Sequence, residues 1–320
     1  MTLPLASRRG LAALAGGIAL AASARDAFAQ APSGAGQALV STDWLAANLR
    51  DPKVRIIEVS VNPGLFERGH VPGATNVSWH RDLVDTVRRD IASREQIQAL
   101  LRRAGVSEDS TVVLYGDNNN WFAAWGAWVL EIHGVRDVRL LDGGRRKWEA
   151  EGKQVSTRPV TQTATTLELP AQPNLALRAR LADVVPIAQS RAAETKLVDI
   201  RSADEYSGRI FAPPGFQELA IRAGHIPGAV NVPWGQAVRP DGTFKSVEEL
   251  RALYAAAGID GSKPIIVYCR IGERSSHTWF ALKRILGYQN VRQYDGSWTE
   301  YGNSVGVPID NPAGTVWGAT

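Results

Sequence analysis

The chain of 320 residues has a single cysteine, Cys269, and this scarcity limits its chemistry. One thiol excludes an intramolecular disulfide and any metal or iron–sulfur site that needs several cysteines. Low-complexity tracts are also missing, so a disordered region is not expected. The net charge is only +4, and three arginines and one aspartate in the first 29 residues account for +2 of it. The nearly neutral remainder argues against the basic footprint of a nucleic-acid-binding protein.

The first 29 residues have the pattern of an export signal. Arg8 and Arg9 precede an apolar run over 11–24, and Ala27-Phe28-Ala29 supplies small residues for cleavage. Paired arginines before a mildly apolar run resemble a twin-arginine signal. An uncleaved anchor is the alternative, but the run is short for a span of ~20 residues. We expect a signal peptide over 1–29 and a periplasmic or secreted mature chain, with no stable membrane association after processing.

The rest of the chain repeats itself. Residues 69–79 (GHVPGATNVSW) return as residues 224–234 (GHIPGAVNVPW), and 142–144 (DGG) return as 295–297 (DGS). With 44% apolar residues and ten tryptophans, the chain can fill two cores. The repeat predicts two copies of one domain, over 39–156 and 177–310, joined by a linker over 157–176 that is rich in Thr, Pro and Gln.

Each copy alternates strand-like with helix-like segments. In the second copy, 196–200 and 265–268 are predicted strands, and 247–257 and 275–286 are predicted helices. The alternation predicts an α/β fold in which each domain has a mostly parallel sheet with helices on both faces. A segment between such a strand and its helix lies at the carboxyl end of the sheet, where ligands bind.

The only thiol lies in a segment of that kind. Residues 269–275 (CRIGERS) join the strand 265–268 to the following helix. Free amides at the helix N-terminus, together with Arg270 and Arg274, favour a thiolate, so we expect a lowered pKa for Cys269. Gly272 allows successive N–H groups to turn inward and form an anion site. A buried, inert cysteine is the alternative.

Comparison of the copies separates fold from chemistry. At an offset of 153 positions, Gly116 stands where Cys269 is, and Trp121 stands where Arg274 is. The first copy therefore lacks the nucleophile and is predicted to be inactive.

Residues that both copies share are interpreted as fold residues. His70 and His225 are shared, as are Asn76 and Asn231. We interpret all four as turn or packing residues rather than as catalytic bases.

The tandem arrangement, the loop 269–275, the turn 224–229 (GHIPGA) and the segment 295–298 (DGSW) together resemble the two-domain thiosulfate sulfurtransferases, or rhodaneses. The resemblance covers 39–310. It implies an inactive rhodanese-like first domain and a catalytic second one. It further implies a ping-pong cycle, in which Cys269 takes the outer sulfur of thiosulfate as a persulfide and passes it to cyanide or a thiol. No metal and no cofactor is implied.

The resemblance implies that the substrate-binding residues are those that follow the cysteine. The arginines would face the dianionic donor, and the loop amides would hold the persulfide. Glu273 is unusual among anion donors, and it either orients an arginine or faces solvent. The full set is Arg270, Ile271, Gly272, Glu273, Arg274 and Ser275.

Asp199, Arg201 and Trp298 resemble residues that line or support the family's pocket. The first copy has Glu58 and Ser60 in place of Asp199 and Arg201, so the acid is shared and the arginine is not. This difference favours a site role for Arg201 and structural support for Asp199. Trp298 lies either beside the pocket or in the core.

Other functions remain open at this point. Cysteine-type phosphatases place five residues between Cys and Arg, whereas four separate Cys269 from Arg274 here, which makes the loop small for phosphate. Mercaptopyruvate sulfurtransferases follow their cysteine with glycine and small or hydroxyl residues, so the two arginines favour thiosulfate. A persulfide carrier that serves a protein partner is a third function. The physiological acceptor, the oligomeric state and the role of the insertion 207–223 are not predicted.

Overall fold

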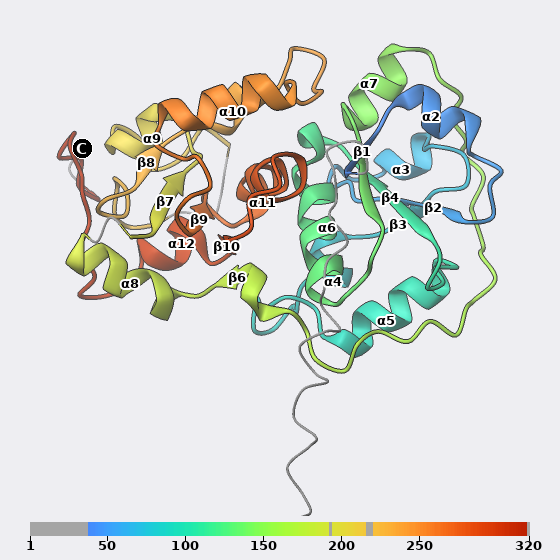
Figure 1. Ribbon diagram of the computed structural model, residues 1–320, viewed down its shortest axis with the longest axis horizontal. Helices are drawn as coiled ribbons and strands as arrows, with labels where there is room; N and C mark the ends of the chain where they lie inside the picture. The colour runs from blue at the N-terminus through green and yellow to red at the C-terminus, as the bar shows by residue number, and fades with distance from the viewer. Residues whose placement is uncertain (1–37, 192–193, 216–219, 319–320) are drawn as a thin grey trace, which may run out of the picture. The chain divides into compact units, whose positions relative to one another are not determined.

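The structure is a computed structural model, and it describes residues 38–191, 194–215 and 220–318. Within these residues it contains two five-stranded parallel sheets, one in each copy (Figure 1). The strand orders are β1-β5-β4-β2-β3 and β6-β10-β9-β7-β8, so the second sheet repeats the topology of the first. The prediction of an α/β fold with two parallel-sheet domains is confirmed.

The first copy runs from blue to green in Figure 1. Its strands are β1 Leu39–Val40, β2 Val54–Glu58, β3 Thr75–Asn76, β4 Thr111–Tyr115 and β5 Val138–Leu141. Its helices are α2 Thr42–Ala47, α3 Leu65–Arg68, α4 Trp79–Asp82, α5 Arg94–Arg103, α6 Trp121–Ile132 and α7 Gly144–Ala150, with the 3-10 turn η2 Asn118–Asn120.

The second copy has the same sequence of elements. Its strands are β6 Arg178–Ala179, β7 Lys196–Asp199, β8 Val230–Asn231, β9 Ile265–Tyr268 and β10 Val291–Tyr294. Its helices are α8 Leu181–Ser190, α9 Ala203–Ser207, α10 Val247–Ala256, α11 Glu273–Phe280 and α12 Ser297–Tyr301, with the short turns η3 Leu175–Leu177, η4 Trp234–Ala237 and η5 Ala281–Ile285.

Both faces of each sheet are buried because side chains alternate along the central strands. In β9, Ile265 and Val267 face one core, whereas Ile266 and Tyr268 face another. The first of these cores contains residues of both copies, because α6 lies against α11 (Figure 1). Cys269 continues the alternation and lies on the side of this shared core.

The helix after the loop differs from the prediction. It begins at Glu273 rather than at residue 275, since Gly272 caps it in the left-handed conformation with φ 98°. It then continues beyond Phe280 as the π-helical turn η5. Glu273 and Arg274 are therefore part of the first helical turn rather than of a free loop.

The segment between the copies has no regular structure before η3. The segment lies along α5, where Arg94 and Arg102 donate hydrogen bonds to the carbonyls of Leu169 and Leu167 at 2.7 and 2.8 Å. The predicted domain limits stay a prediction, although the strands of the two sheets run from Leu39 to Leu141 and from Arg178 to Tyr294.

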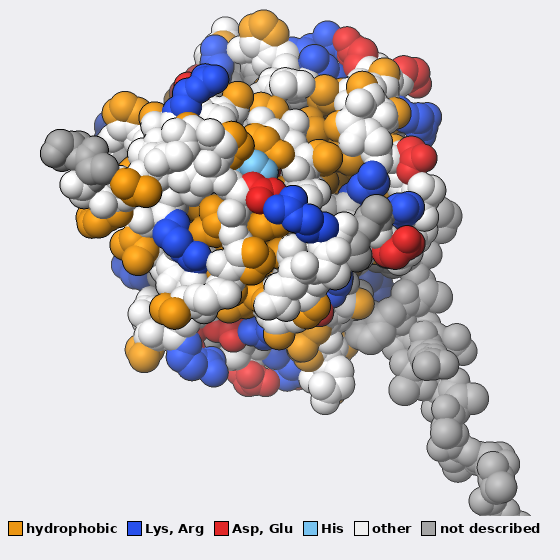
Figure 2. All heavy atoms as spheres, turned by 90° about the vertical axis from the view of Figure 1, so that its left-hand side faces the viewer, with side chains coloured by type: hydrophobic (Ala, Val, Ile, Leu, Met, Phe, Trp, Pro, Cys, Tyr) orange, Lys and Arg blue, Asp and Glu red, His pale blue; other side chains and the backbone are white. Residues whose placement is uncertain are grey.

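The predicted leader, 1–29, lies outside the described residues. Among the residues that are described, no helix has the length and apolar character to cross a membrane. On the face in Figure 2, Lys and Arg side chains are dispersed among acidic and uncharged ones, in keeping with the near-neutral composition.

Candidate functional site

The loop that carries Cys269 runs from the end of β9 to the start of α11. The sulfur of Cys269 accepts a hydrogen bond from the Gly272 N–H at 3.1 Å, and the Cys269 N–H donates to the Ser297 hydroxyl at 3.1 Å. Gly272 has φ 98°, and a Cβ there would lie 2.4 Å from the ring of Trp125. Glycine alone fits both constraints, and it allows the chain to fold back over the sulfur.

The carbonyl groups of this loop are bonded to groups outside the sulfur site. The carbonyls of Cys269 and Arg270 accept hydrogen bonds from the N–H groups of Trp298 and Thr299 at 3.0 and 2.9 Å. The Gly272 carbonyl accepts from Gln293 Nε2 at 3.2 Å and from the hydroxyls of Ser275 and Ser276 at 3.0 and 2.9 Å. Since a trans peptide directs its N–H opposite to its C=O, these bonds direct the N–H groups of the same peptides away from those partners.

Two acids and two arginines surround the sulfur. A Glu273 carboxylate oxygen lies 3.5 Å from the sulfur, and the same carboxylate lies 3.8 Å from Arg270 and 3.6 Å from Arg274. Arg274 also donates two hydrogen bonds of 3.1 Å to Glu205 of α9. All four side chains are buried. Glu273 therefore orients arginines, as one of its two predicted roles required, and does not face solvent.

The expected lowering of the thiol pKa is wrong. Cys269 is 0% exposed, and burial raises its pKa above the ordinary value, with a further increase from the Glu273 charge. Arg274 and Ser275 lower the pKa, but their effect is smaller. The sequence placed two positive charges beside the sulfur, whereas the structure neutralises them with two carboxylates.

The first copy has no space for a nucleophile. A Cβ at Gly116 would lie 2.2 Å from the carbonyl oxygen of Val59. The Asp117 carboxylate accepts the N–H groups of Val61 and Asn62, so the equivalent loop is bonded to its own copy. The absence of a cysteine from this loop thus coincides with a backbone that excludes any side chain.

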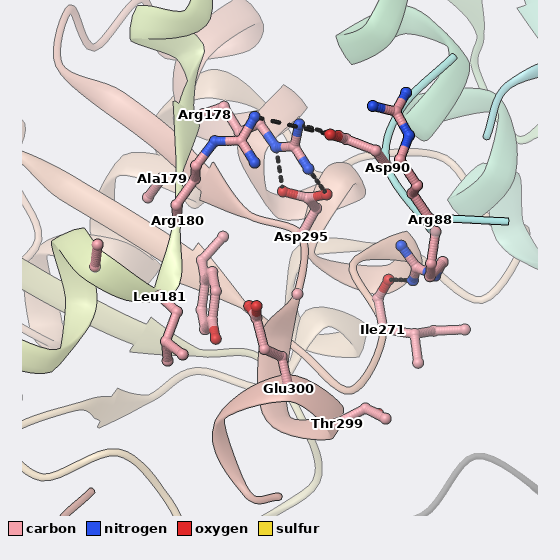
Figure 3. A pocket seen from close by; sticks show the side chains of 14 residues that line it. Arg88, Asp90, Arg178, Ala179, Arg180, Leu181, Ile271, Asp295, Thr299 and Glu300 are labelled. Carbon is pink, nitrogen blue, oxygen red and sulfur yellow. Dashed lines mark hydrogen bonds and ion pairs between the residues drawn. The ribbon is translucent and has the colours of Figure 1, made fainter. Parts of the chain in front are cut away.

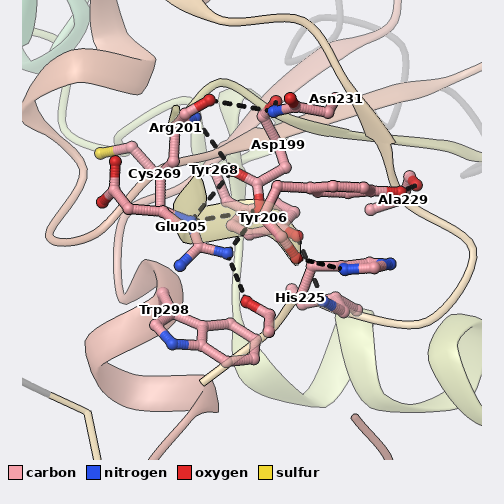
Figure 4. A network of polar contacts seen from close by, with 12 residues as sticks. Asp199, Arg201, Glu205, Tyr206, His225, Ala229, Asn231, Tyr268, Cys269 and Trp298 are labelled. Carbon is pink, nitrogen blue, oxygen red and sulfur yellow. Dashed lines mark hydrogen bonds and ion pairs between the residues drawn. The ribbon is translucent and has the colours of Figure 1, made fainter. Parts of the chain in front are cut away.

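Asp199 and Arg201 form a buried ion pair at the end of β7 (Figure 4). The Arg201 guanidinium donates to both carboxylate oxygens of Asp199 and to the carbonyl of Gly224 at 2.7 Å, and it lies 4.7 Å from the ring centre of Trp298. It does not contact the Cys269 sulfur. These contacts give both residues a structural role, and the site role favoured for Arg201 stays a prediction.

The first copy contains a similar buried ion pair, but its arginine comes from another position in the sequence. There Arg145 of α7 pairs with Glu58 at 2.8 Å and donates to the carbonyl of Gly69, the counterpart of Gly224. The arginine is therefore shared after all, but it comes from a different element. Trp298 is 1% exposed, and its indole N–H donates to the Arg222 carbonyl at 3.1 Å, which makes it a core residue.

The shared histidines and Asn231 have packing and turn roles, as predicted. His70 stacks on Phe66 and His225 stacks on Tyr206, with ring centres 3.8 and 3.7 Å apart. The Asn231 amide donates to the carbonyls of Asp199 and Arg201, each at 2.9 Å.

Three residues of this site were not found from the sequence: Glu205, Ser297 and Arg89. Glu205 forms a capping box with Ser202, and this pattern predicts the start of a helix. It gives no indication of the ion pair that Glu205 forms with Arg274. The signal that could have found it is the comparison of copies. Phe66 and Tyr206 are equivalent because they stack on the shared histidines, and the residue before them is Leu65 in the first copy and Glu205 in the second. Arg89 comes from the first copy and donates to the Ile271 carbonyl at 2.6 Å.

A pocket of about 570 Å³ lies beside the loop, on the side of β6 (Figure 3). Arg89, Arg178, Arg180, Asp295 and Ile271 are among its lining residues, and Cys269 is not. Within the described ranges, no group of three or more His, Cys, Asp or Glu residues could hold a metal ion.

Part of the insertion 207–223 packs on the segment that follows α12. The Arg222 guanidinium donates to the carbonyls of Gly302 and Val307 at 2.9 and 3.0 Å. Residues 216–219 of the insertion lie outside the described residues.

Comparisons with known proteins give a consistent result. The profile of the rhodanese-like domain matches residues 41–151 and 186–304. The sulfur carrier protein TtuD of Thermus thermophilus is 52% identical over 275 residues, which are 85% of this chain and 96% of that protein. A protein of Mycolicibacterium smegmatis, provisionally named a thiosulfate sulfurtransferase, is 50% identical over 273 residues, or 85% and 97% of the two chains.

Solved structures are similar as well. YnjE is 29% identical, with a TM-score of 0.72 over 86% of this chain and 68% of that one. EanB in a cysteine-persulfide state with ergothioneine is 25% identical, with a TM-score of 0.73 over 85% and 70% of the two chains.

Proposed function

Because the chain belongs to the rhodanese-like family, we propose that it moves the outer sulfur of thiosulfate to an acceptor through a persulfide on Cys269. The family and the relatives named for thiosulfate sulfur transfer support a sulfurtransferase. Thiosulfate as the donor and Cys269 as the carrier of the sulfur are the parts that we propose.

In the first step, the Cys269 thiol loses its proton and attacks the outer sulfur of thiosulfate. The sulfur–sulfur bond of thiosulfate breaks, and its electron pair leaves with sulfite, which also takes up the proton. The products are hydrogen sulfite and the Cys269 persulfide anion. In the second step, cyanide attacks the outer sulfur of the persulfide, so that thiocyanate leaves and the Cys269 thiolate is restored.

The observation that carries this proposal is the main-chain hydrogen bond that the Cys269 sulfur accepts. The Gly272 N–H bonds the sulfur at 3.1 Å, and the loop carbonyls are bonded elsewhere. A persulfide anion has the same need for N–H donors as a thiolate, and such donors do not have to reorganise when the charge forms. Since Cys269 is buried, side chains around it have to shift to admit a donor.

Intact-mass measurement tests the persulfide. Incubation of the purified protein with thiosulfate should add the mass of one sulfur atom, and subsequent addition of cyanide should remove it with release of thiocyanate. The Cys269→Ser protein is the matched control and should gain nothing. A wild-type protein that stays at its original mass would contradict the proposal.

A persulfide carrier is the second candidate, because the relative of 52% identity is named a sulfur carrier protein. A carrier and a small-molecule enzyme both form the persulfide, so turnover separates them. Multiple turnovers with cyanide or small thiols support the enzyme, whereas persulfide formation without turnover supports the carrier. The ratio of kcat/KM for thiosulfate and mercaptopyruvate tests the choice of donor in the same assay.

We also propose that the mature protein is periplasmic or secreted. The support is the pattern of 1–29, in which Arg8 and Arg9 precede the apolar run. Replacement of both arginines by lysine should leave the full-length precursor inside the cell, and a variant that is still processed and exported would contradict a twin-arginine signal.

A further inference from the structure

A loop of the first copy reaches the sulfur-bearing loop of the second. Its ends are joined by the antiparallel bridge between Val84 and Ile91. Next to that bridge, Asp90 is bonded to Arg178, which also pairs with Asp295 at the end of β10 (Figure 3). The loop is therefore fixed at its base and at the second copy.

Arg89 occupies a position in this loop that favours glycine. Its φ is 59°, in the left-handed region, and the equivalent residue of the second copy is Gly242, with φ 87°. The loop around Gly242 docks in the same manner on the first copy, where Phe244 N–H donates to Asp142 at 2.9 Å. Docking is thus common to both copies, and the arginine is found in only one. A side chain kept in a strained conformation suggests a functional reason.

The side chain of Arg89 ends at the sulfur-bearing loop. Its Nη2 donates to the carbonyl of Ile271 at 2.6 Å, and its guanidinium lies 5.4 Å from the ring centre of Trp79 and 5.6 Å from that of Trp125. The ring of Trp125 also fills the space in front of Gly272. The two aromatic rings hold the guanidinium in place through cation–π contacts.

The Ile271 carbonyl and the Gly272 N–H belong to one peptide group. In a trans peptide they point in opposite directions, so a donor on the carbonyl side fixes the N–H on the sulfur side. We propose that Arg89 of the inactive copy is a positioning residue, which holds the Ile271–Gly272 peptide with its N–H directed at the Cys269 sulfur.

A fixing group is needed because glycine follows this carbonyl. Gly272 adopts positive and negative φ with similar ease, so the backbone alone does not prevent the peptide from flipping. A flipped peptide would direct the Ile271 oxygen toward a thiolate or persulfide and remove the 3.1 Å hydrogen bond. The positive charge of Arg89 also polarises the peptide, which strengthens its N–H as a donor. The inference gives the inactive copy a part in the chemistry of the active one.

Other charged groups surround the sulfur and have to be kept constant in a test. They lie on the loop and α11, on α9, on β7 with the residues after it, and on the β6–β10 side. They are Arg270, Glu273, Arg274, Glu205, Asp199, Arg201, Arg178 and Asp295.

The test compares Arg89→Gly, Arg89→Lys and Arg88→Ala in the full chain. Arg89→Gly restores the residue that the other copy has and relieves the left-handed strain, so its melting temperature should stay the same or rise. The apparent pKa of Cys269, measured from the pH dependence of its alkylation by iodoacetamide, should rise by about 0.5–1 unit. This rise corresponds to roughly three- to tenfold less thiolate at a fixed pH. Arg89→Lys should recover part of this loss. Arg88→Ala, which removes an equal charge paired with Asp85, should follow the wild-type profile.

An Arg89→Gly protein that melts earlier and keeps the wild-type alkylation profile would assign Arg89 to docking alone and overturn the inference. An equal shift in Arg88→Ala would also overturn it, because a distant charge would then explain the effect. The benefit of this positioning for sulfur transfer rests on the proposed function, but alkylation of Cys269 needs no sulfur donor. If the wild-type protein gains no sulfur from thiosulfate, the proposed function fails while the alkylation comparison still decides on Arg89.

Discussion

The carboxylate of Glu273 lies 3.5 Å from the sulfur of Cys269, and both side chains are closed to solvent. A carboxylate at this distance stabilises a thiol, which donates a hydrogen bond to it, and destabilises a thiolate. The same group pairs with Arg270 and Arg274, so it also limits the positive charge available to an anionic donor. Burial and the Glu273 charge thus both raise the pKa of the Cys269 thiol, and they favour its protonated form.

Replacement of Glu273 by glutamine should lower the pKa of the Cys269 thiol. The Glu273 charge is one of the causes that raise this pKa, and glutamine keeps the shape without the charge. The pH profile of alkylation by iodoacetamide should move to lower pH by about one unit, or tenfold in thiolate at a fixed pH. Glu248→Gln, on the exposed side of α10, is the control and should have no effect. A profile that moves to higher pH would mean that Glu273 acts mainly by holding its arginines in place.

The raised thiol pKa also predicts a pH dependence of stability. Below the ordinary value of 9.0, both the folded and the unfolded chain keep the thiol proton, so the contribution to stability is fully present. At higher pH the unfolded chain loses the proton first, and the contribution is lost as the pH rises through the folded pKa. Each unit of difference is worth about 1.4 kcal/mol. The wild-type free energy of unfolding should therefore fall relative to that of Cys269→Ala above pH 9, and parallel curves would contradict the raised pKa.

The parts of the fold that could be predicted depend on local patterns. The strand β9 is an unbroken apolar run, and the repeat identified both domains and the loss of the nucleophile at Gly116. Gly272 was recognised for the same reason, since its role needs only its own backbone.

The remainder depends on partners that lie far away in the chain. Glu205 meets Arg274 across 69 positions, and Arg89 meets Ile271 across 182. No periodicity connects such residues, so the neutralisation of both arginines and the sign of the thiol pKa shift could not be obtained from the loop sequence. The counterpart of Arg201 in the first copy was missed because that copy supplies it, as Arg145, from another element.

Removal of Arg274 should destabilise the fold as well as impair sulfur transfer. Glu205 is 0% exposed, and the charge and hydrogen bonds of Arg274 offset the burial that opposes its ionisation. Arg274→Ala leaves this carboxylate buried without its partner, which should cost about 3–5 kcal/mol in the free energy of unfolding. Arg274→Gln combined with Glu205→Gln should recover most of the stability, but not the rate of persulfide formation from thiosulfate.

The control for these variants is an exposed ion pair between Asp204, on α9, and Arg209, just after it. Arg209→Ala should cost no more than about 1 kcal/mol, because solvent screens such a pair. Denaturant unfolding of all four proteins gives the comparison. A double variant that transfers sulfur at the wild-type rate would show that neither charge serves the chemistry.

Installation of a cysteine in the first copy should fail to create a second site. A Cβ at Gly116 would lie 2.2 Å from the Val59 carbonyl oxygen, so Gly116→Cys has to displace β2 or β4 at a cost of about 1–3 kcal/mol. Gly235→Ala is the control, because nothing lies within 4 Å of its Cβ. In a Cys269→Ser background, the Gly116→Cys protein should unfold at lower denaturant and gain no sulfur from thiosulfate. A mass increase of one sulfur would show that the loop of the first copy can still hold a persulfide, and that the missing thiol alone makes it inactive.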